Sequence, residues 1–184
     1  MKKTKNILYC ALMVSITAIL SQFIIPLPPV PISLSWIAVY LTGVLLEKKM
    51  AFWTQTAFLL LGAVGAPVFS GFSGGLAKLA GPTGGYLIVY PFMAFIIAFI
   101  VEKWGHSCLK YGAAMIVASL VGYAGGTAWL AVSGHISFQA ALAAGVLPFV
   151  WGDLLKVIFT SVFAGALQKA LSHAGLLSVN TAQK

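Results

Sequence analysis

The segment LPFVWGDLLKVIFTSVFAGALQKA occupies residues 147–170 and is apolar along almost its whole length. A helix needs about 20 predominantly apolar residues to cross the hydrocarbon core of a bilayer, and this segment is long enough. Pro148 suits the first turn of such a helix, where no backbone donor is required. The segment therefore predicts a membrane-spanning helix that carries two charges, Asp153 and Lys156, inside it.

Further apolar segments precede this one, near residues 7–25, 34–46, 51–65, 85–101 and 112–132. The chain of 184 residues is 60% hydrophobic and 8% charged, which leaves too few charges to cover a water-facing surface. We therefore predict an all-α integral protein of the cell membrane, a single domain over 1–184 with six transmembrane helices. The segment 34–46 is short for a span, so we expect it to use flanking residues or to be shielded by its neighbours.

The placement of the lysines predicts the orientation in the membrane. If the six spans alternate, nine lysines fall on one side: Lys2, Lys3, Lys5, Lys48, Lys49, Lys103, Lys110, Lys169 and Lys184. Positive residues favour the cytoplasmic side, so both termini are predicted to be cytoplasmic. The charge does not indicate nucleic-acid binding, because no basic stripe interleaved with aromatic residues is present. Lys78 and Lys156 lie outside this pattern.

Asp153 and Lys156 form the strongest polar signal in the chain. Their spacing of three residues places them on one face of a helix. Each charge near the middle of a bilayer costs about 2.5–3.5 kcal/mol, so both side chains are expected to face the interior of the helix bundle. One interpretation is a structural ion pair that satisfies itself. The other is a functional site, which is the usual role of ionisable residues inside a membrane.

A second signal lies in the Gly-rich segment 65–86, which connects the third and fourth predicted spans. Because this segment is also apolar, we expect it to fold back against the helices. It ends in Gly81-Pro82-Thr83-Gly84-Gly85-Tyr86, and glycines before a helix allow backbone amides to approach an anionic ligand. The alternative is that these glycines serve only helix packing. Lys78, on the outer side, favours an anionic ligand such as a carboxylate.

Several aromatic residues lie near the predicted span ends. The tryptophans are interpreted mainly as an interfacial belt: Trp36, Trp53, Trp104, Trp129 and Trp151. Four aromatic residues beside the polar signals are also candidates to line a pocket: Tyr86, Tyr90, Phe149 and Trp151. Cys10 and Cys108 lack metal-ligand spacing, and no metal site is predicted.

Gly71-Phe72-Ser73-Gly74-Gly75 matches the G-x-S-x-G pattern of serine hydrolases, and His135 on the same side would be the base. The match lies in a predicted loop, however, and His135 lies between spans, whereas a catalytic dyad inside a membrane is held on two helices. An intramembrane hydrolase is therefore kept only as an alternative, and the chain is predicted not to be an enzyme.

Two motifs resemble those of the BioY family, the biotin-specific substrate-binding subunits of energy-coupling-factor (ECF) transporters. The first runs from Gly74-Gly75-Leu76 to Gly81-Pro82-Thr83-Gly84-Gly85-Tyr86-Leu87, and the second joins Pro148-Phe149 to Gly152-Asp153-Leu154-Leu155-Lys156. The resemblance extends over nearly the whole chain. It departs from the family pattern at Tyr90-Pro91 and at Trp151, which affects the shape of a pocket more than the charged positions.

This resemblance implies a binding site for biotin and a role for each candidate residue. Asp153 would accept ureido N–H groups, and Lys156 would neutralise Asp153 or bind the ureido carbonyl. Lys78 would bind the carboxylate with help from Thr83 and the Gly84 backbone. Gly75 belongs to the first motif, Tyr86 and Phe149 would pack on the apolar body of the ligand, and the Pro-rich loop 26–31 would close as a lid.

The resemblance also implies partners. Biotin captured from outside would be delivered through a membrane coupling subunit and two cytoplasmic ATPases, so the chain itself would need no cofactor and would not use ATP. Ala11 and Ser15 place small residues on one face of the first span, where a partner subunit could dock. Internal packing is the alternative for that face. Another small vitamin as substrate, and transport by this chain alone, remain alternatives at this point.

Overall fold

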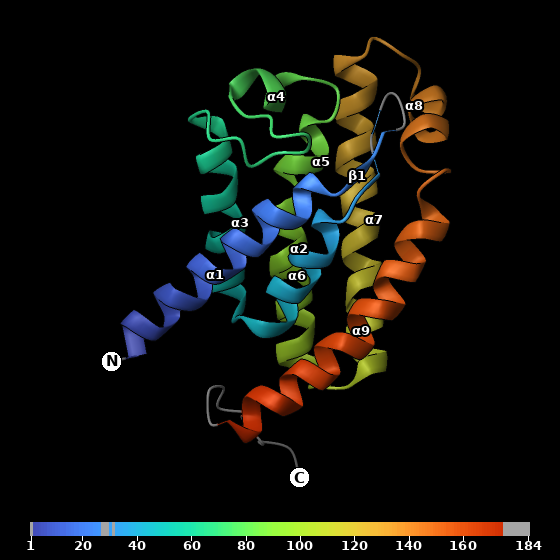
Figure 1. Ribbon diagram of the computed structural model, residues 1–184. Coiled ribbons are helices and arrows are strands. Elements are labelled where there is room, and N and C mark those ends of the chain that lie inside the picture. Colours follow the sequence, from blue (N-terminus) through green and yellow to red (C-terminus); the bar gives the residue numbers. More distant parts are fainter. Residues whose placement is uncertain (1, 27–29, 31, 175–184) are drawn as a thin grey trace.

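The computed structural model describes residues 2–26, 30 and 32–174. These residues form a bundle of helices with one short hairpin (Figure 1). In chain order the elements are α1 (Lys2–Gln22), β1 (Ile24–Ile25), β2 (Ile32–Ser33), α2 (Ser35–Leu45), α3 (Lys48–Ala63), α4 (Leu76–Ala80), α5 (Gly84–Ile88), α6 (Tyr90–Trp104), α7 (Cys108–Ser133), α8 (Phe138–Gly145) and α9 (Val150–His173).

Four stretches of described helix are long and apolar enough to cross a membrane: Thr4–Gln22, Gly84–Trp104, Cys108–Ser133 and Val150–His173. The 11 residues of α2 reach only about 17 Å, which is less than the hydrocarbon core. Nine of those residues are buried, and α2 packs against α1, α6 and α9. Of the two ways in which segment 34–46 could fit a membrane, shielding by neighbouring helices is therefore the one observed.

The first helix ends earlier than predicted. Ile24 and Ile25 belong to strand β1, which pairs antiparallel with β2, so the range 7–25 was three residues too long. Pro26 explains why Ile25 is not helical, because a proline disfavours the helical conformation of the residue before it. Phe23 belongs to the base of the hairpin, where its carbonyl accepts the Leu34 amide at 3.1 Å. The predicted lid, 26–31, falls partly outside the described residues, since only Pro26 and Val30 of that range are described.

The Gly-rich segment folds back against the bundle, as predicted. Phe69 is fully buried and packs edge-to-face on Phe58 of α3, with ring centroids 5.5 Å apart. Gly62 makes room for it, since a Cβ there would lie 2.0 Å from the Phe69 ring. The segment also contains α4, which was not predicted. Nor was α8 predicted, although Ser137 caps it by accepting a hydrogen bond from the Ala140 amide at 3.2 Å.

The two ends of the bundle differ in character (Figure 1). The beginning of α1 and the end of α9 lie at the same end. The hairpin, α4 and α8 lie at the opposite end, with the connection from α3 to α5 folded over it. The candidate site lies beneath these loops.

Candidate functional site

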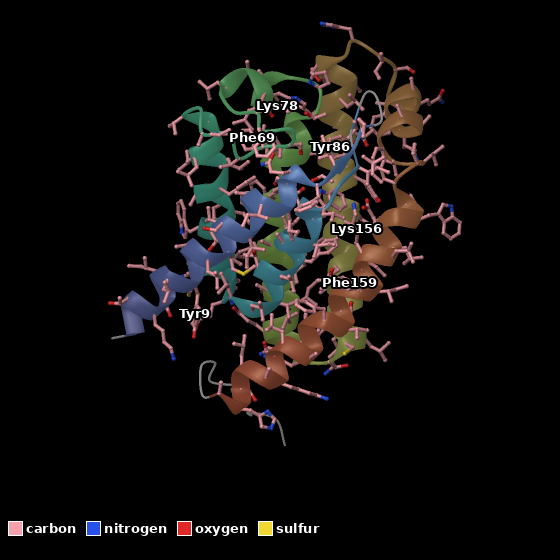
Figure 2. The ribbon with its side chains drawn as sticks, in the orientation of Figure 1. Tyr9, Phe69, Lys78, Tyr86, Lys156 and Phe159 are labelled. Atoms are coloured by element: carbon pink, nitrogen blue, oxygen red, sulfur yellow. The ribbon has the colours of Figure 1, made fainter. Side chains whose placement is uncertain are left out.

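A pocket opens at the end of the bundle that carries the hairpin, α4 and α8. Strand β2, seven helices and the loops between them line it, through Val30, Ser33, Trp36, Ser70, Lys78, Thr83, Tyr86, Leu87, Tyr90, Tyr123, Gly145, Phe149, Asp153 and Lys156. It measures about 590 Å³ when its open mouth is included, and its enclosed cavity is much smaller, about 60 Å³. The site is therefore a narrow cleft between side chains. Figure 2 shows Lys78 on α4, Tyr86 below it and Lys156 nearer the middle of the bundle.

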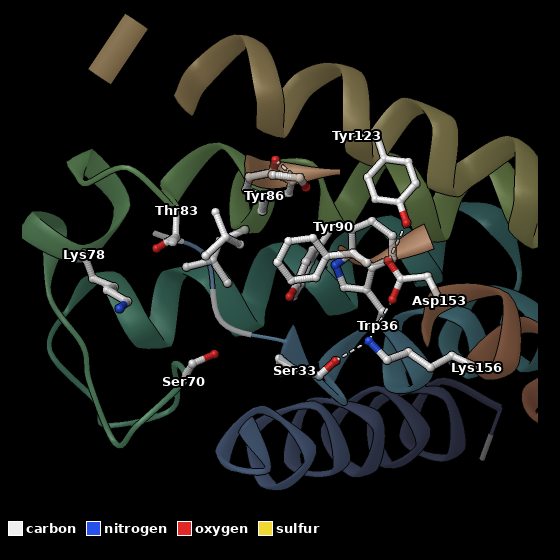
Figure 3. A pocket seen from close by; sticks show the side chains of 14 residues that line it. Ser33, Trp36, Ser70, Lys78, Thr83, Tyr86, Tyr90, Tyr123, Asp153 and Lys156 are labelled. Atoms are coloured by element: carbon white, nitrogen blue, oxygen red, sulfur yellow. Dashed lines mark hydrogen bonds and ion pairs between the residues drawn. The ribbon is translucent and has the colours of Figure 1, made fainter. Parts of the chain in front are cut away.

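The inner end of the pocket holds the Asp153–Lys156 ion pair. The two residues are only 6% and 8% exposed, and Lys156 Nζ lies 2.8 Å from Asp153 Oδ1. Tyr123 donates its hydroxyl to Asp153 Oδ2 at 2.6 Å, and Lys156 Nζ also donates to the Ser33 carbonyl at 2.7 Å (Figure 3). Both charges are thus compensated inside the protein, as burial of ions in a low-dielectric environment requires.

This ion pair keeps capacity for a ligand. A carboxylate has about four acceptor positions and an ammonium has three donors. Among the described residues, Asp153 accepts one bond at each oxygen, and Lys156 donates two. A ligand with adjacent N–H and C=O groups can therefore add bonds to both residues without breaking the ion pair.

The middle of the pocket is aromatic. The rings of Trp36 and Tyr123 lie 5.3 Å apart, and Tyr86, Tyr90 and Phe149 contribute further aromatic surface. The hydroxyls of the two α5–α6 tyrosines are engaged within the protein. Tyr86 donates to the Gly145 carbonyl at 3.0 Å, and the Tyr90 hydroxyl lies 2.6 Å from Ser35 Oγ. Their rings are thereby fixed as apolar walls that can hold a flat or aliphatic group.

A second polar region lies at the opposite end of the pocket. Figure 3 shows Lys78, Thr83 and Ser70 there, separated from Asp153 and Lys156 by the aromatic residues. Lys78 is half-buried, and within the part of the chain that the structure describes its ammonium forms no ion pair or hydrogen bond. This end can accommodate a negatively charged group, since the lysine supplies an uncompensated positive charge.

Six of the eight residues predicted for the site line the pocket: Lys78, Thr83, Tyr86, Phe149, Asp153 and Lys156. Gly75 and Gly84 do not. Gly75 begins α4 with a φ of 90°, and its amide donates to the Gly62 carbonyl at 2.7 Å. The Gly84 amide donates to the Gly81 carbonyl at 2.9 Å, and a Cβ there would lie 1.7 Å from the Leu79 carbonyl oxygen. Both glycines therefore shape the backbone that carries Lys78 and Thr83, while help from the Gly84 backbone in binding a carboxylate stays a prediction.

The structure places three aromatic residues in ways that the sequence does not predict. Trp36 was assigned to an interfacial belt, but it is 7% exposed and lines the pocket. Trp151 is the reverse case: it is a pocket candidate from the sequence, but it is 76% exposed and does not line the pocket. Tyr123 was not singled out, although a hydroxyl in the middle of an apolar segment is a signal that could have identified it.

The serine-hydrolase alternative finds no support in the geometry. Ser73 lies in a tight turn, where its hydroxyl donates to the Ser70 carbonyl at 2.8 Å. No histidine among the described residues makes a hydrogen bond to it, and His135 is exposed beyond the end of α7. A nucleophile needs a base within hydrogen-bonding reach, so Ser73 is not arranged for catalysis.

Comparison with known proteins identifies close similarities. The sequence matches the BioY family over residues 1–173. It is 37% identical to the probable biotin transporter BioY of Pyrococcus horikoshii, with 90% of this chain and 98% of that protein covered. It is 35% identical to the biotin transporter BioY2 of Lactococcus lactis, with 98% and 100% covered. The crystal structure of the S-component for biotin from an ECF-type ABC transporter matches with a TM-score of 0.86 at 31% identity, covering 91% of this chain and 93% of that chain.

Proposed function

The chain belongs to the BioY family, and we propose that it captures biotin at the outer side of the membrane as the S-component of an ECF-type transporter. It is a transporter subunit and not an enzyme. The assignment to this pocket rests on the order of its groups: a compensated ion pair at one end, aromatic walls in the middle, and at the other end a lysine with no ion pair to any described residue. Biotin has the same order of groups, namely a ureido ring, an apolar thioether ring and chain, and a carboxylate.

We assign the ureido ring to Asp153 and Lys156. The remaining acceptor positions of Asp153 suit the ureido N–H groups, while the third donor of Lys156 suits the ureido carbonyl. Tyr123 orients the carboxylate by donating to its second oxygen. Hydrogen bonds to charged groups are stronger than those between neutral groups. The Asp153–Lys156 end of the pocket would therefore reject biotin analogues that lack the ureido N–H groups.

We assign the valerate carboxylate to Lys78, assisted by the Thr83 hydroxyl. The thioether ring and the aliphatic chain would lie between, against Trp36, Tyr86 and Phe149. Lys156 is the less suitable lysine for the carboxylate, because it already compensates Asp153 at 2.8 Å.

The finer topology and the partners are part of this proposal. We propose six membrane crossings with both termini in the cytoplasm, as the lysine distribution favours. A membrane coupling subunit and two cytoplasmic ATPases would supply the energy, and this chain would need no cofactor of its own. Ala11 and Ser15 are exposed on α1, beside the exposed side chains of Leu8, Leu12 and Ile19, which supports this face as the docking surface.

The first test is calorimetric titration of biotin into the detergent-purified chain without partners. We expect one-to-one binding that other small vitamins do not compete for, because the two polar ends select both a ureido ring and a carboxylate. If the protein shows a cooperative thermal unfolding transition, and is therefore folded, but binds no biotin, this function is ruled out. Uptake by liposomes that contain only this chain would show that it transports alone.

The role of Lys78 is tested with biotin and biotinamide, which differ in the charge of the carboxyl group. Wild-type protein is expected to prefer biotin by about 10- to 100-fold, since a hydrogen bond to a charged group contributes about 1.5–3 kcal/mol. In Lys78→Gln this preference should largely disappear through weaker binding of biotin, whereas Lys103→Gln at the other end of the bundle should behave like wild type. An unchanged preference for biotin over biotinamide in Lys78→Gln would show that another residue binds the carboxylate.

A further inference from the structure

Gln22, the last residue of α1, links this helix to the Gly-rich segment. It is half-buried, and its side-chain amide forms three hydrogen bonds. Nε2 donates to the Ala18 carbonyl at 3.0 Å within α1 and to the Val68 carbonyl at 3.2 Å. Oε1 accepts the backbone amide of Phe72 at 2.7 Å. One side chain thus binds both sides of the turn formed by residues 68–72, much as the edge of a neighbouring strand would.

This turn forms part of the pocket wall. Phe69 and Ser73 close it with backbone hydrogen bonds of 2.9 and 3.3 Å, and Ser70 at its tip lines the pocket. Phe72 has a φ of 53°, a left-handed conformation that non-glycine residues rarely adopt, so the turn needs support from outside. The bond from its amide to Gln22 Oε1 supplies such support at this residue.

Gln22 also lies directly before the hairpin, which forms another wall. The hairpin is closed at its base by the Leu34 amide, which donates to the Phe23 carbonyl at 3.1 Å. Its second strand carries Ser33, whose carbonyl accepts the bond from Lys156. The end of α1 is therefore the point at which the hairpin and the turn 68–72 are joined.

We propose that Gln22 is a positioning residue that holds the turn 68–72 against the end of α1 and thereby slows the escape of biotin. The inference rests on the proposed function and extends it. Because the tether is part of α1, a displacement of α1 would pull on the pocket wall through Gln22. The helix that exposes Ala11 and Ser15 would then be mechanically connected to the mouth of the site.

The test compares Gln22→Met with Gln55→Met. Methionine has a similar length but cannot form the bonds to Val68 and Phe72, and the partly exposed position should tolerate it. Gln55 is the matched control, since its Nε2 also binds α1, at Thr17 Oγ1 (3.2 Å), but its side-chain hydrogen bonds among the described residues go only to helices α1 and α2. Biotin dissociation is measured by chase with unlabelled biotin, folding by thermal unfolding, and the turn by hydrogen exchange of peptides covering 68–73.

In Gln22→Met we expect dissociation to accelerate about tenfold, as the loss of two hydrogen bonds implies, together with faster exchange in 68–73. Gln22→Glu, which keeps an acceptor for Phe72 but has no donor for Val68, should fall in between. Gln55→Met should retain the wild-type dissociation rate even if it unfolds at a lower temperature. An unchanged biotin dissociation rate in folded Gln22→Met, or an equal acceleration in Gln55→Met, would overturn this inference but not the proposed function. Absence of biotin binding by wild-type protein would instead overturn the proposed function and this inference with it.

Discussion

Asp153→Ala is expected to weaken biotin binding by about 30- to 5,000-fold. Truncating one partner of a buried, hydrogen-bonded charge pair typically costs 2–5 kcal/mol, which corresponds to this range. Two effects act together here. In the proposed binding mode the ureido N–H groups lose their acceptor, and the Lys156 ammonium, 8% exposed, keeps only the Ser33 carbonyl as a partner among the described residues. Titration of biotin into the purified variant measures the loss.

A double variant separates loss of binding from loss of folding. Removing one charge of a buried pair is strongly destabilising, whereas replacing both by apolar residues of similar volume is often neutral. Asp153→Leu combined with Lys156→Met should therefore unfold at a higher temperature than Asp153→Ala, yet still fail to bind biotin. Gly152→Ala serves as the control, because a Cβ at Gly152 has no heavy atom within 4 Å. Wild-type affinity in folded Asp153→Ala would refute the assignment of the ureido ring.

Gly126→Ala is expected to abolish measurable biotin binding, although Gly126 does not line the pocket. A Cβ at this position of α7 would lie 2.2 Å from two atoms of the Tyr86 ring, which is far inside van der Waals contact. The ring is also confined on its hydroxyl side, where a Cβ at Gly145 would lie 2.2 Å from the Tyr86 hydroxyl. A displaced ring finds space mainly in the pocket, where it would occupy the volume that the ligand needs.

The same substitution should lower the thermal unfolding temperature, since overpacking of a tight core typically costs about 1–3 kcal/mol. Combining it with Tyr86→Leu should restore much of this stability but not the binding, because the aromatic wall and its bond to the Gly145 carbonyl are then missing. Scanning fluorimetry and biotin titration measure the two quantities separately. If Gly126→Ala bound biotin as tightly as Gly152→Ala, the close packing of Tyr86 would not determine the shape of the site.

The sequence was most informative where a bilayer imposes a simple requirement. Apolar length predicted helices in all six ranges that were proposed, and each range contains a helix in the structure. Asp153 and Lys156 were predicted to face the interior because isolated charges are too costly in lipid, and both are buried. By contrast, α1 ended three residues before the apolar run ended, because Pro26 disfavours a helical Ile25 and residues 23–25 form hairpin hydrogen bonds instead.

By itself, then, the sequence determined that the chain is a helical membrane protein of the BioY family and which charges lie inside it. Only the tertiary structure decided that Trp36 and Tyr123 line the pocket, that Trp151 faces outward, and that Gln22 holds the turn 68–72. The physical reason is that lipid and protein core are both apolar. A helix in a bilayer shows no contrast between its outer and inner faces, so periodicity cannot tell which aromatic side chain turns inward. That choice depends on packing between segments far apart in the chain.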